Sequence, residues 1–358
     1  MQIGLVGLPY SGKTTFFNLL TGLQRETGPG GKGEVHLGSA KVPDSRLDYL
    51  FQCYQPAKKV NAQIQFKDIP GVRFDQGASL AARTWEEVRS ADVLVQVVRA
   101  FRDEFVSPVA GELDPLLEIN ELALELLLAD ISVVENRLRR LSEARKPPQD
   151  ASLQRAVLKK ILNALENEQP VASLQLDLTE REAIGGQKFL SEKPLLFVVN
   201  LDQGQFSSGS YPGREAVLEY ASRLDRPVIE ACALIEAEIS ELPPADRPEF
   251  LADLGIEEPG ISRLARVAYR HLGLITFFTV GEDEVRAWPI RRGTVARKAA
   301  GKVHTDMERG FIRAETVSFD DLYRSGSAAG AREKGLYRLE GKDYPVEDGD
   351  IINFRFNV

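Results

Sequence analysis

A lysine and a threonine near the amino terminus stand at the spacing that binds phosphate. Residues 7–14 read Gly-Leu-Pro-Tyr-Ser-Gly-Lys-Thr, which matches G-x-x-x-x-G-K-[ST] in full. Glycines at both ends let backbone N–H groups turn toward an anion, while the lysine reaches the β- and γ-phosphates and the threonine hydroxyl ligates Mg²⁺. An apolar run at residues 3–6 precedes the loop and a helical period follows it, which is the strand–loop–helix context that the motif requires. The predicted phosphate-binding residues are Gly7, Tyr10, Ser11, Gly12, Lys13, Thr14 and Thr15, with Lys13 as the catalytic cation.

A second motif supplies a carboxylate for the same metal ion. Residues 62–67 alternate apolar and polar side chains as a strand does, and Asp68-Ile69-Pro70-Gly71 follows. An aspartate at a strand end can hold Mg²⁺ through a water, and a glycine lets its N–H point at the γ-phosphate. The predicted metal ligands are therefore Thr14 and Asp68, with Gly71 beside the phosphates.

A third group of residues is expected to contact the base. The apolar strand at residues 194–199 ends in Asn200-Leu201-Asp202-Gln203, and a further short strand runs into Cys232 and Ala233. Guanine selection uses a carboxylate at the position of Gln203, whereas a glutamine both donates to and accepts from the Watson–Crick edge of adenine. The predicted base-side residues are Asn200, Leu201, Gln203, Cys232 and Ala233, and ATP is favoured over GTP. Cys232 itself is expected to act as a small apolar side chain that fills space in the core, and a redox role stays open.

Apolar strands that alternate with helices predict an α/β fold with a mostly parallel sheet covered on both faces. The ligand site of such a sheet lies at the carboxyl ends of its strands, where each of these motifs falls. Residues 1–273 are expected to form this nucleotide-binding domain.

A helical hairpin is predicted as an insertion at about residues 112–190. Asp114 and Pro115 begin a helix that runs to about Lys146, and Asp150 caps a second helix. A heptad seam is predicted along the first helix, at Leu117, Leu124, Leu127, Ile131, Val134, Leu138 and Leu141. Self-packing and a partner-binding surface both remain open as its role.

The sequence pattern changes again from residue 274 to residue 358, where short strands are expected to alternate with turns that contain Gly and Asp. This pattern predicts a separate α+β domain. Residues 285–302 carry six lysines and arginines and no acid. A solvated face and an RNA or ribosome contact are the two readings of this basic stretch. The glycine-rich loop at residues 27–33 is likewise either a nucleotide-sensing switch or a plain surface connection.

Composition bounds the class of protein. The chain has 358 residues, a net charge of −8, 43% apolar residues and two cysteines. The negative charge argues against indiscriminate nucleic-acid binding, and two distant cysteines form no disulfide framework. No basic leader or membrane-length apolar run occurs, so we expect a cytoplasmic protein with no membrane partner.

Several stretches resemble the YchF family, also called Obg-like ATPases. They are Ala233–Glu238, Leu274–Gly281, Ala299–Asp306 and Phe354–Val358. The resemblance covers nearly the whole chain and implies a Ras-like P-loop domain with a coiled-coil insertion and a carboxyl-terminal TGS domain of β-grasp type. It also implies slow nucleotide hydrolysis that usually favours ATP, and association with ribosomes.

The sequence departs from the family pattern at identifiable positions. Tyr10 replaces the usual asparagine, which puts a potassium requirement in doubt. Lys32 stands where the first switch presents a threonine, with Thr27 as a weak substitute, and the second switch is shortened to residues 72–77. Val72 follows Gly71, where many GTPases carry the glutamine that orients water, so turnover should be slow. Gln203 replaces the family's glutamate.

Two functions follow as hypotheses. The first is a slow, Mg²⁺-dependent ATPase or GTPase that acts as a monomeric switch and contacts the ribosome or RNA through the TGS domain and hairpin. The second is a scaffold with a degenerate pocket that tethers the ribosome or RNA. A metabolic kinase is disfavoured by the motifs at Asp68 and Asn200.

Overall fold

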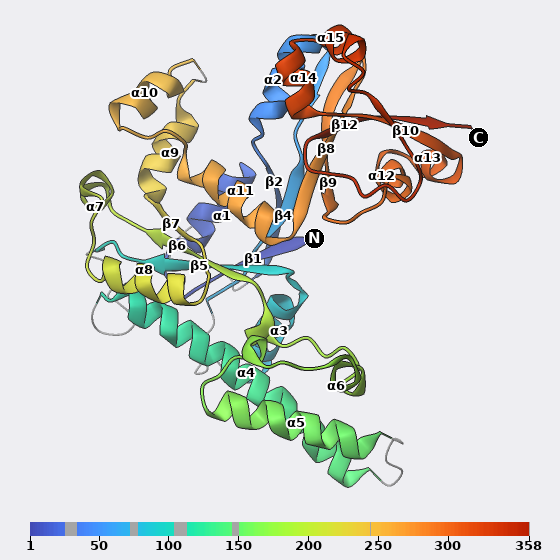
Figure 1. Ribbon diagram of the computed structural model, residues 1–358. Coiled ribbons are helices and arrows are strands. Elements are labelled where there is room, and N and C mark those ends of the chain that lie inside the picture. Colours follow the sequence, from blue (N-terminus) through green and yellow to red (C-terminus); the bar gives the residue numbers. More distant parts are fainter. Residues whose placement is uncertain (26–33, 72–77, 104–112, 145–149, 244, 358) are drawn as a thin grey trace. The chain divides into compact units, whose positions relative to one another are not determined.

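The computed structural model describes residues 1–25, 34–71, 78–103, 113–144, 150–243 and 245–357, and the chain divides into two compact units (Figure 1). The first unit contains residues 1–38 and 65–261, and the second contains residues 39–64 and 262–358. This division differs from the predicted boundary at residue 273, because residues 39–64 belong with the carboxyl-terminal part of the chain. We call residues 39–64 the crossover segment.

A six-stranded sheet forms the centre of the first unit. Its order is β2 (His36–Lys41), β4 (Gln63–Asp68), β1 (Gln2–Val6), β5 (Val93–Arg99), β6 (Leu195–Asn200) and β7 (Val228–Ala231). The pairs β4–β1, β1–β5, β5–β6 and β6–β7 are parallel. All residues of β5 and β6 are buried, as expected of parallel strands covered on both faces. The predicted α/β P-loop fold is confirmed.

Among the described residues, the first unit also contains nine helices, of which α5 packs on α4 and not on the sheet. The helices are α1 (Lys13–Thr21), α3 (Ala78–Ser90), α4 (Pro115–Glu143), α5 (Ala151–Glu166), α6 (Leu178–Ala183), α7 (Gln203–Ser208), α8 (Arg214–Arg223), α9 (Ala233–Glu241) and α10 (Arg247–Asp253). Short 3-10 turns lie at η2 (Val171–Ser173) and η3 (Leu190–Glu192). The sheet therefore aligns the carboxyl ends of β1, β4 and β6, which carry the predicted motifs.

The predicted hairpin is present as α4 and α5, and Asp114 caps α4 through its side chain. The predicted seam is wrong in its first half, because Leu117 and Leu124 are 39% and 47% exposed. The buried positions there are Ile119, Leu122, Leu126 and Ala129, which join the core of the sheet. Further along, Val134 and Leu141 pack with α5. The apolar stripe rotates because the helix changes partner along its length.

A second six-stranded sheet forms the other unit. Its order is β11 (Arg338–Glu340), β10 (Phe311–Ser318), β12 (Asp350–Phe356), β8 (Leu274–Val280), β9 (Glu284–Arg291) and β3 (Lys58–Val60). The helices of this unit are α2 (Ser45–Tyr54), most of α11 (Gly260–His271), α12 (Ala296–Val303), α13 (Thr305–Arg309), α14 (Phe319–Ser325) and α15 (Ala328–Glu333). The β8–β9 hairpin is followed by α12, and β12 lies parallel to β8. This order is the one expected of a β-grasp fold.

The strand β3 comes from the crossover segment and forms one edge of this sheet, parallel to β9. Among the described residues, no helix is both long and apolar enough to span a membrane.

Candidate functional site

The loop between β1 and α1 needs the two glycines of its motif for steric reasons. Gly7 has φ +144°, and a Cβ there would lie 2.4 Å from the carbonyl oxygen of Val97. Gly12 has φ +98°, and a Cβ there would lie 2.4 Å from Nδ2 of Asn200. No L side chain fits either position without displacing its neighbours. The loop is therefore wound closely against β5 and β6, which turns its backbone toward the start of α1.

Lys13 lies inside this loop and is 6% exposed. Its Nζ donates a hydrogen bond to the carbonyl of Leu8 at 2.7 Å. Burial lowers the pKa of Lys13 to about 8, although the charges of Asp68 and Glu118 act in the opposite direction. A phosphate would supply the counter-charge that a single carbonyl does not, so the lysine is well placed to hold an anion.

Thr14 and Asp68 meet directly. The Oγ1 of Thr14 donates to Oδ2 of Asp68 at 2.8 Å, and the carboxylate is 6% exposed. Burial raises the pKa of Asp68, while the hydrogen bond from Thr14 and the charge of Lys13 oppose that shift. A hydroxyl and a carboxylate oxygen are the ligand types that Mg²⁺ takes, alone or through water. The residues present therefore fit a magnesium ion between α1 and the end of β4.

The remaining loop residues have distinct environments. Tyr10 has φ +64° and is 45% exposed, an uncommon backbone conformation for an aromatic residue. The hydroxyl oxygen of Ser11 is buried without a hydrogen-bond partner among the described residues, which is the condition that an incoming ligand group relieves. Thr15 is partly buried in the first turn of α1. A Cβ on Gly71 would lie 2.8 Å from the backbone nitrogen of Pro9, so Gly71 lies directly against the loop.

Asn200 joins the phosphate loop to the predicted base-contacting loop. Its Nδ2 donates to the carbonyl of Ser11 at 3.1 Å, and its Oδ1 accepts from the backbone N–H of Ala233 at 3.2 Å. The side chain is 4% exposed, and its neighbour Leu201 is buried as well. In the structure, Asn200 therefore connects the phosphate loop to the loop before α9 by hydrogen bonds to both.

Gln203 and Cys232 lie at the starts of two helices. Asp202 caps α7 in a capping box with Gln205, which leaves Gln203 as the first helical residue. Its Nε2 donates to Oε1 of Glu238 at 3.4 Å. Cys232 is 1% exposed at the start of α9, and burial raises the pKa of its thiol. The roles of these residues toward a base remain predictions.

Glu118 was not singled out by the sequence. It is the buried glutamate in the first turn of α4, and its Oε2 accepts from the backbone N–H of Arg99 at 3.0 Å. Acidic residues are common in first helical turns, so no sequence signal separates this one from a helix-end charge. Other predictions, at Thr27, Lys32 and residues 72–77, lie outside the described residues.

Comparisons with known proteins agree with this geometry. A family model described as "50S ribosome-binding GTPase" matches residues 2–137. A second model, for the carboxyl-terminal part of YchF GTPases and described as "Protein of unknown function (DUF933)", matches residues 274–357.

Whole proteins match over their full lengths. The chain is 41% identical to the ribosome-binding ATPase YchF of Bacillus subtilis over 366 residues, covering 100% of both chains. It is 34% identical to Obg-like ATPase 1 of Oryza sativa, covering 100% of this chain and 92% of the relative. The solved structure of the Schizosaccharomyces pombe YchF GTPase superposes with a TM-score of 0.85 at 28% identity, covering 99% of this chain and 97% of that one.

Proposed function

The chain belongs to the YchF family, and from this premise we propose that it is a ribosome-associated nucleoside triphosphatase that binds ATP with Mg²⁺ and hydrolyses it slowly. The observation that supports this most directly is the joint placement of Lys13, Thr14 and Asp68. A buried cation and a hydroxyl–carboxylate pair meet at one helix start, where a triphosphate and its metal are held.

The proposed chemistry is positioning and charge neutralisation. Loop N–H groups and Lys13 bind the phosphates, Thr14 and Asp68 hold the magnesium ion, and Gly71 lies against the loop near the γ-phosphate. Magnesium supplies charge neutralisation across the β- and γ-phosphates. Val72 follows Gly71 in the sequence and cannot orient an attacking water, so unaided turnover is expected to be slow.

ATP is proposed over GTP on two grounds. Gln203 offers no carboxylate to the guanine edge, and the relatives from Bacillus subtilis and Oryza sativa are named ATPases, whereas the Schizosaccharomyces pombe protein is named a GTPase. The Bacillus subtilis relative is also named ribosome-binding, which supports the carboxyl-terminal unit and the hairpin as contact surfaces for the ribosome or its RNA. We propose that the protein acts as a monomer in the cytoplasm, where ribosomes are found.

The test is Lys13→Ala, followed by calorimetric titration with a non-hydrolysable ATP analogue in the presence of Mg²⁺. Loss of a buried charge partner should weaken binding by about thirtyfold or more. Lys159→Ala is the matched control, because Lys159 is exposed on α5 and is expected to leave affinity unchanged. Equal affinities of wild type and Lys13→Ala would exclude this site.

Hydrolysis separates the proposal from a scaffold with a degenerate pocket. The proposed enzyme releases phosphate in a Mg²⁺-dependent reaction that Lys13→Ala abolishes, with or without ribosomes. A scaffold shows no release above background under either condition. The same titration with a GTP analogue tests base choice, and tight GTP binding without ATP binding would reverse that assignment.

A further inference from the structure

The strand that ends at Asp68 is covalently continuous with the second unit. The chain passes from the first unit to the second within β2, between residues 38 and 39, and returns within β4, between residues 64 and 65. Four residues after that return, Asp68 accepts the hydrogen bond of Thr14. The crossover segment is therefore joined to Asp68 directly through β4.

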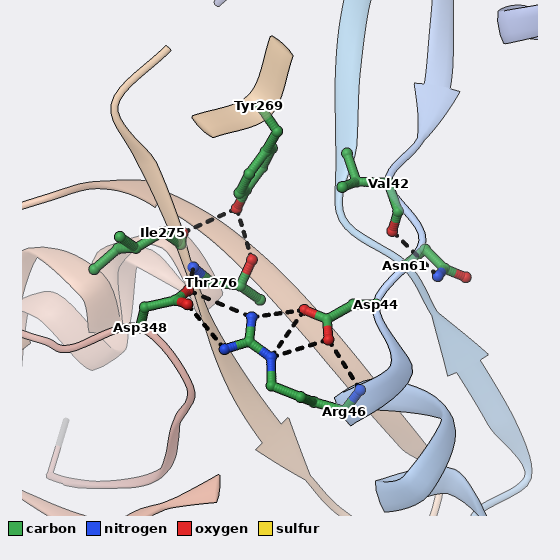
Figure 2. Close-up of polar contacts among 8 residues, drawn as sticks. All are labelled: Val42, Asp44, Arg46, Asn61, Tyr269, Ile275, Thr276 and Asp348. Atoms are coloured by element: carbon green, nitrogen blue, oxygen red, sulfur yellow. Dashed lines mark hydrogen bonds and ion pairs between the residues drawn. The ribbon is translucent and has the colours of Figure 1, made fainter. Parts of the chain in front are cut away.

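The crossover segment is built firmly into the second unit. Leu47 and Leu50 of α2 are fully buried, and β3 pairs with β9. Near the two ends of the segment, the N–H of Val42 donates to the carbonyl of Ala62 at 2.8 Å. Figure 2 shows the adjacent hydrogen bond, in which Nδ2 of Asn61 donates to the carbonyl of Val42 at 3.4 Å. The two ends of the segment are thereby tied together where it leaves and rejoins the sheet strands.

Arg46 on α2 clamps this segment to the carboxyl-terminal part of the chain. As Figure 2 shows, its guanidinium bridges two carboxylates, with Nη2 2.7 Å from Oδ2 of Asp44 and Nη1 2.9 Å from Oδ2 of Asp348. Asp348 in turn accepts from the backbone N–H of Thr276 on β8 at 2.8 Å. The guanidinium also lies 5.2 Å from the ring centroid of Phe278. The Arg46–Asp348 pair thus connects residues that are 302 positions apart in the sequence.

We propose that Arg46 and Asp348 are positioning residues through which the second unit sets how strongly the site discriminates a nucleoside triphosphate from a diphosphate. This inference rests on the proposed nucleotide site and adds its regulation. The α- and β-phosphates are held by the loop between β1 and α1, which lies outside the crossover segment. Asp68 at the end of β4 is a proposed Mg²⁺ ligand, and a triphosphate brings that ion the additional charge of its γ-phosphate. Fixing the crossover segment should therefore change triphosphate affinity and leave diphosphate affinity nearly constant. By linkage, a partner on the second unit that shifts this segment shifts triphosphate affinity equally, and the triphosphate shifts affinity for that partner.

The sharpest variant is Asp348→Asn, because the amide oxygen can still accept from Thr276 while the negative charge opposite Arg46 is lost. The two affinities to measure are those for ADP and for a non-hydrolysable ATP analogue, both with Mg²⁺. We expect the ADP dissociation constant to stay within about twofold and the ratio of the two constants to change about threefold to fivefold, the range set by a partly exposed ion pair. Asp348→Glu, which keeps the charge, should return the ratio toward that of the wild type.

Glu315→Gln is the matched control. It removes the ion pair between Glu315 on β10 and Arg355 on β12, 3.1 Å apart and also in the second unit, without touching the crossover segment. A second measurement needs no variant. Amide hydrogen exchange of the wild type is compared between its ADP complex and its ATP-analogue complex: the exchange rates should differ in α2 and β3 and should be the same in α12.

The outcomes separate the two proposals. Wild-type binding of both nucleotides, with an unchanged ratio in Asp348→Asn and identical exchange in α2 and β3, would overturn this inference alone. An equal change of ratio in Glu315→Gln would also overturn it, because the effect would then follow any charge lost from the unit. Failure of the wild type to bind either nucleotide would overturn the proposed function together with this inference.

Discussion

Two carboxylates from different parts of the chain act on the loop lysine. Asp68 ends a sheet strand, whereas Glu118 begins the helical insertion, and both raise the pKa of Lys13 against the effect of burial. Burial raises the pKa of Glu118 itself to about 7, although the N–H and charge of Arg99 and the charge of Lys13 oppose the shift. The first turn of α4 is thus electrostatically part of the phosphate site.

Glu118 predicts a pH dependence of stability with a defined sign. Between its ordinary pKa of 4.5 and about 7, the folded chain holds a proton that the unfolded chain has released. The contribution of Glu118 to the free energy of unfolding therefore falls as pH rises through that window, by up to about 3 kcal/mol. Glu118→Gln, whose amide oxygen can still accept from Arg99, should gain stability relative to wild type between about pH 5 and about pH 8.

Urea denaturation at both pH values measures this difference, with Glu135→Gln as the control on the exposed face of the same helix. A stability difference between wild type and Glu118→Gln that is the same at both pH values would contradict the prediction.

The sequence predicted the residues of this site unevenly, for physical reasons. Gly7, Gly12 and Lys13 follow from a motif whose loop geometry is fixed over eight positions. The left-handed backbone of Tyr10 was not foreseen, although the asparagine usual in the family favours that conformation. The bond from Gln203 to Glu238 on α9 depends on a tertiary contact that no local pattern encodes.

The helix α4 is one continuous element with two different partners. Its first half packs on the core of the sheet, and its second half packs on α5. The sequence predicted the helix and its capping residue because those signals are local. It misplaced the first half of the buried stripe because a heptad pattern assumes one partner along the whole length.

Packing in the second half predicts the stability of the hairpin. Ile161 of α5 is fully buried in the cluster with Val134 and Leu141, so Ile161→Ala should lower the free energy of unfolding by about 2 to 4 kcal/mol. Leu124→Ala is the control, since that side chain is 47% exposed and its loss is expected to change stability by about 0.5 kcal/mol or less. Equilibrium urea unfolding, followed by helical circular dichroism, measures both; equal effects would restore the predicted heptad seam.

The course of the chain between the two units is the feature that sequence patterns least reveal. Alternation predicted most of the strands, but the same signal occurs in a strand that joins the first sheet and one that joins the second. β3 has three residues, and its partner β9 lies more than two hundred positions away. Only the pairing of distant segments assigns residues 39–64 to the second unit.

A chain ended at residue 273 tests this organisation. The sequence-based boundary predicts that residues 1–273 fold as an independent domain. In the structure that truncation removes β8 and β9, against which the crossover segment packs, and exposes Leu47 and Leu50, both fully buried in the whole chain. Burying each such leucine contributes about 2 kcal/mol, so we expect the truncated protein to aggregate or to melt at a lower temperature than the full chain.

The matched variant ends at residue 261, where the first unit ends, and joins Gly38 to Gln65 through a short glycine–serine linker, which removes the crossover segment together with its partners. Since β2 and β4 are neighbours in the first sheet, this variant should be soluble and should melt cooperatively. Size-exclusion chromatography and thermal melting distinguish the two chains. Folding of residues 1–273 as well as the linked variant would mean that the crossover segment does not depend on the second sheet for its stability.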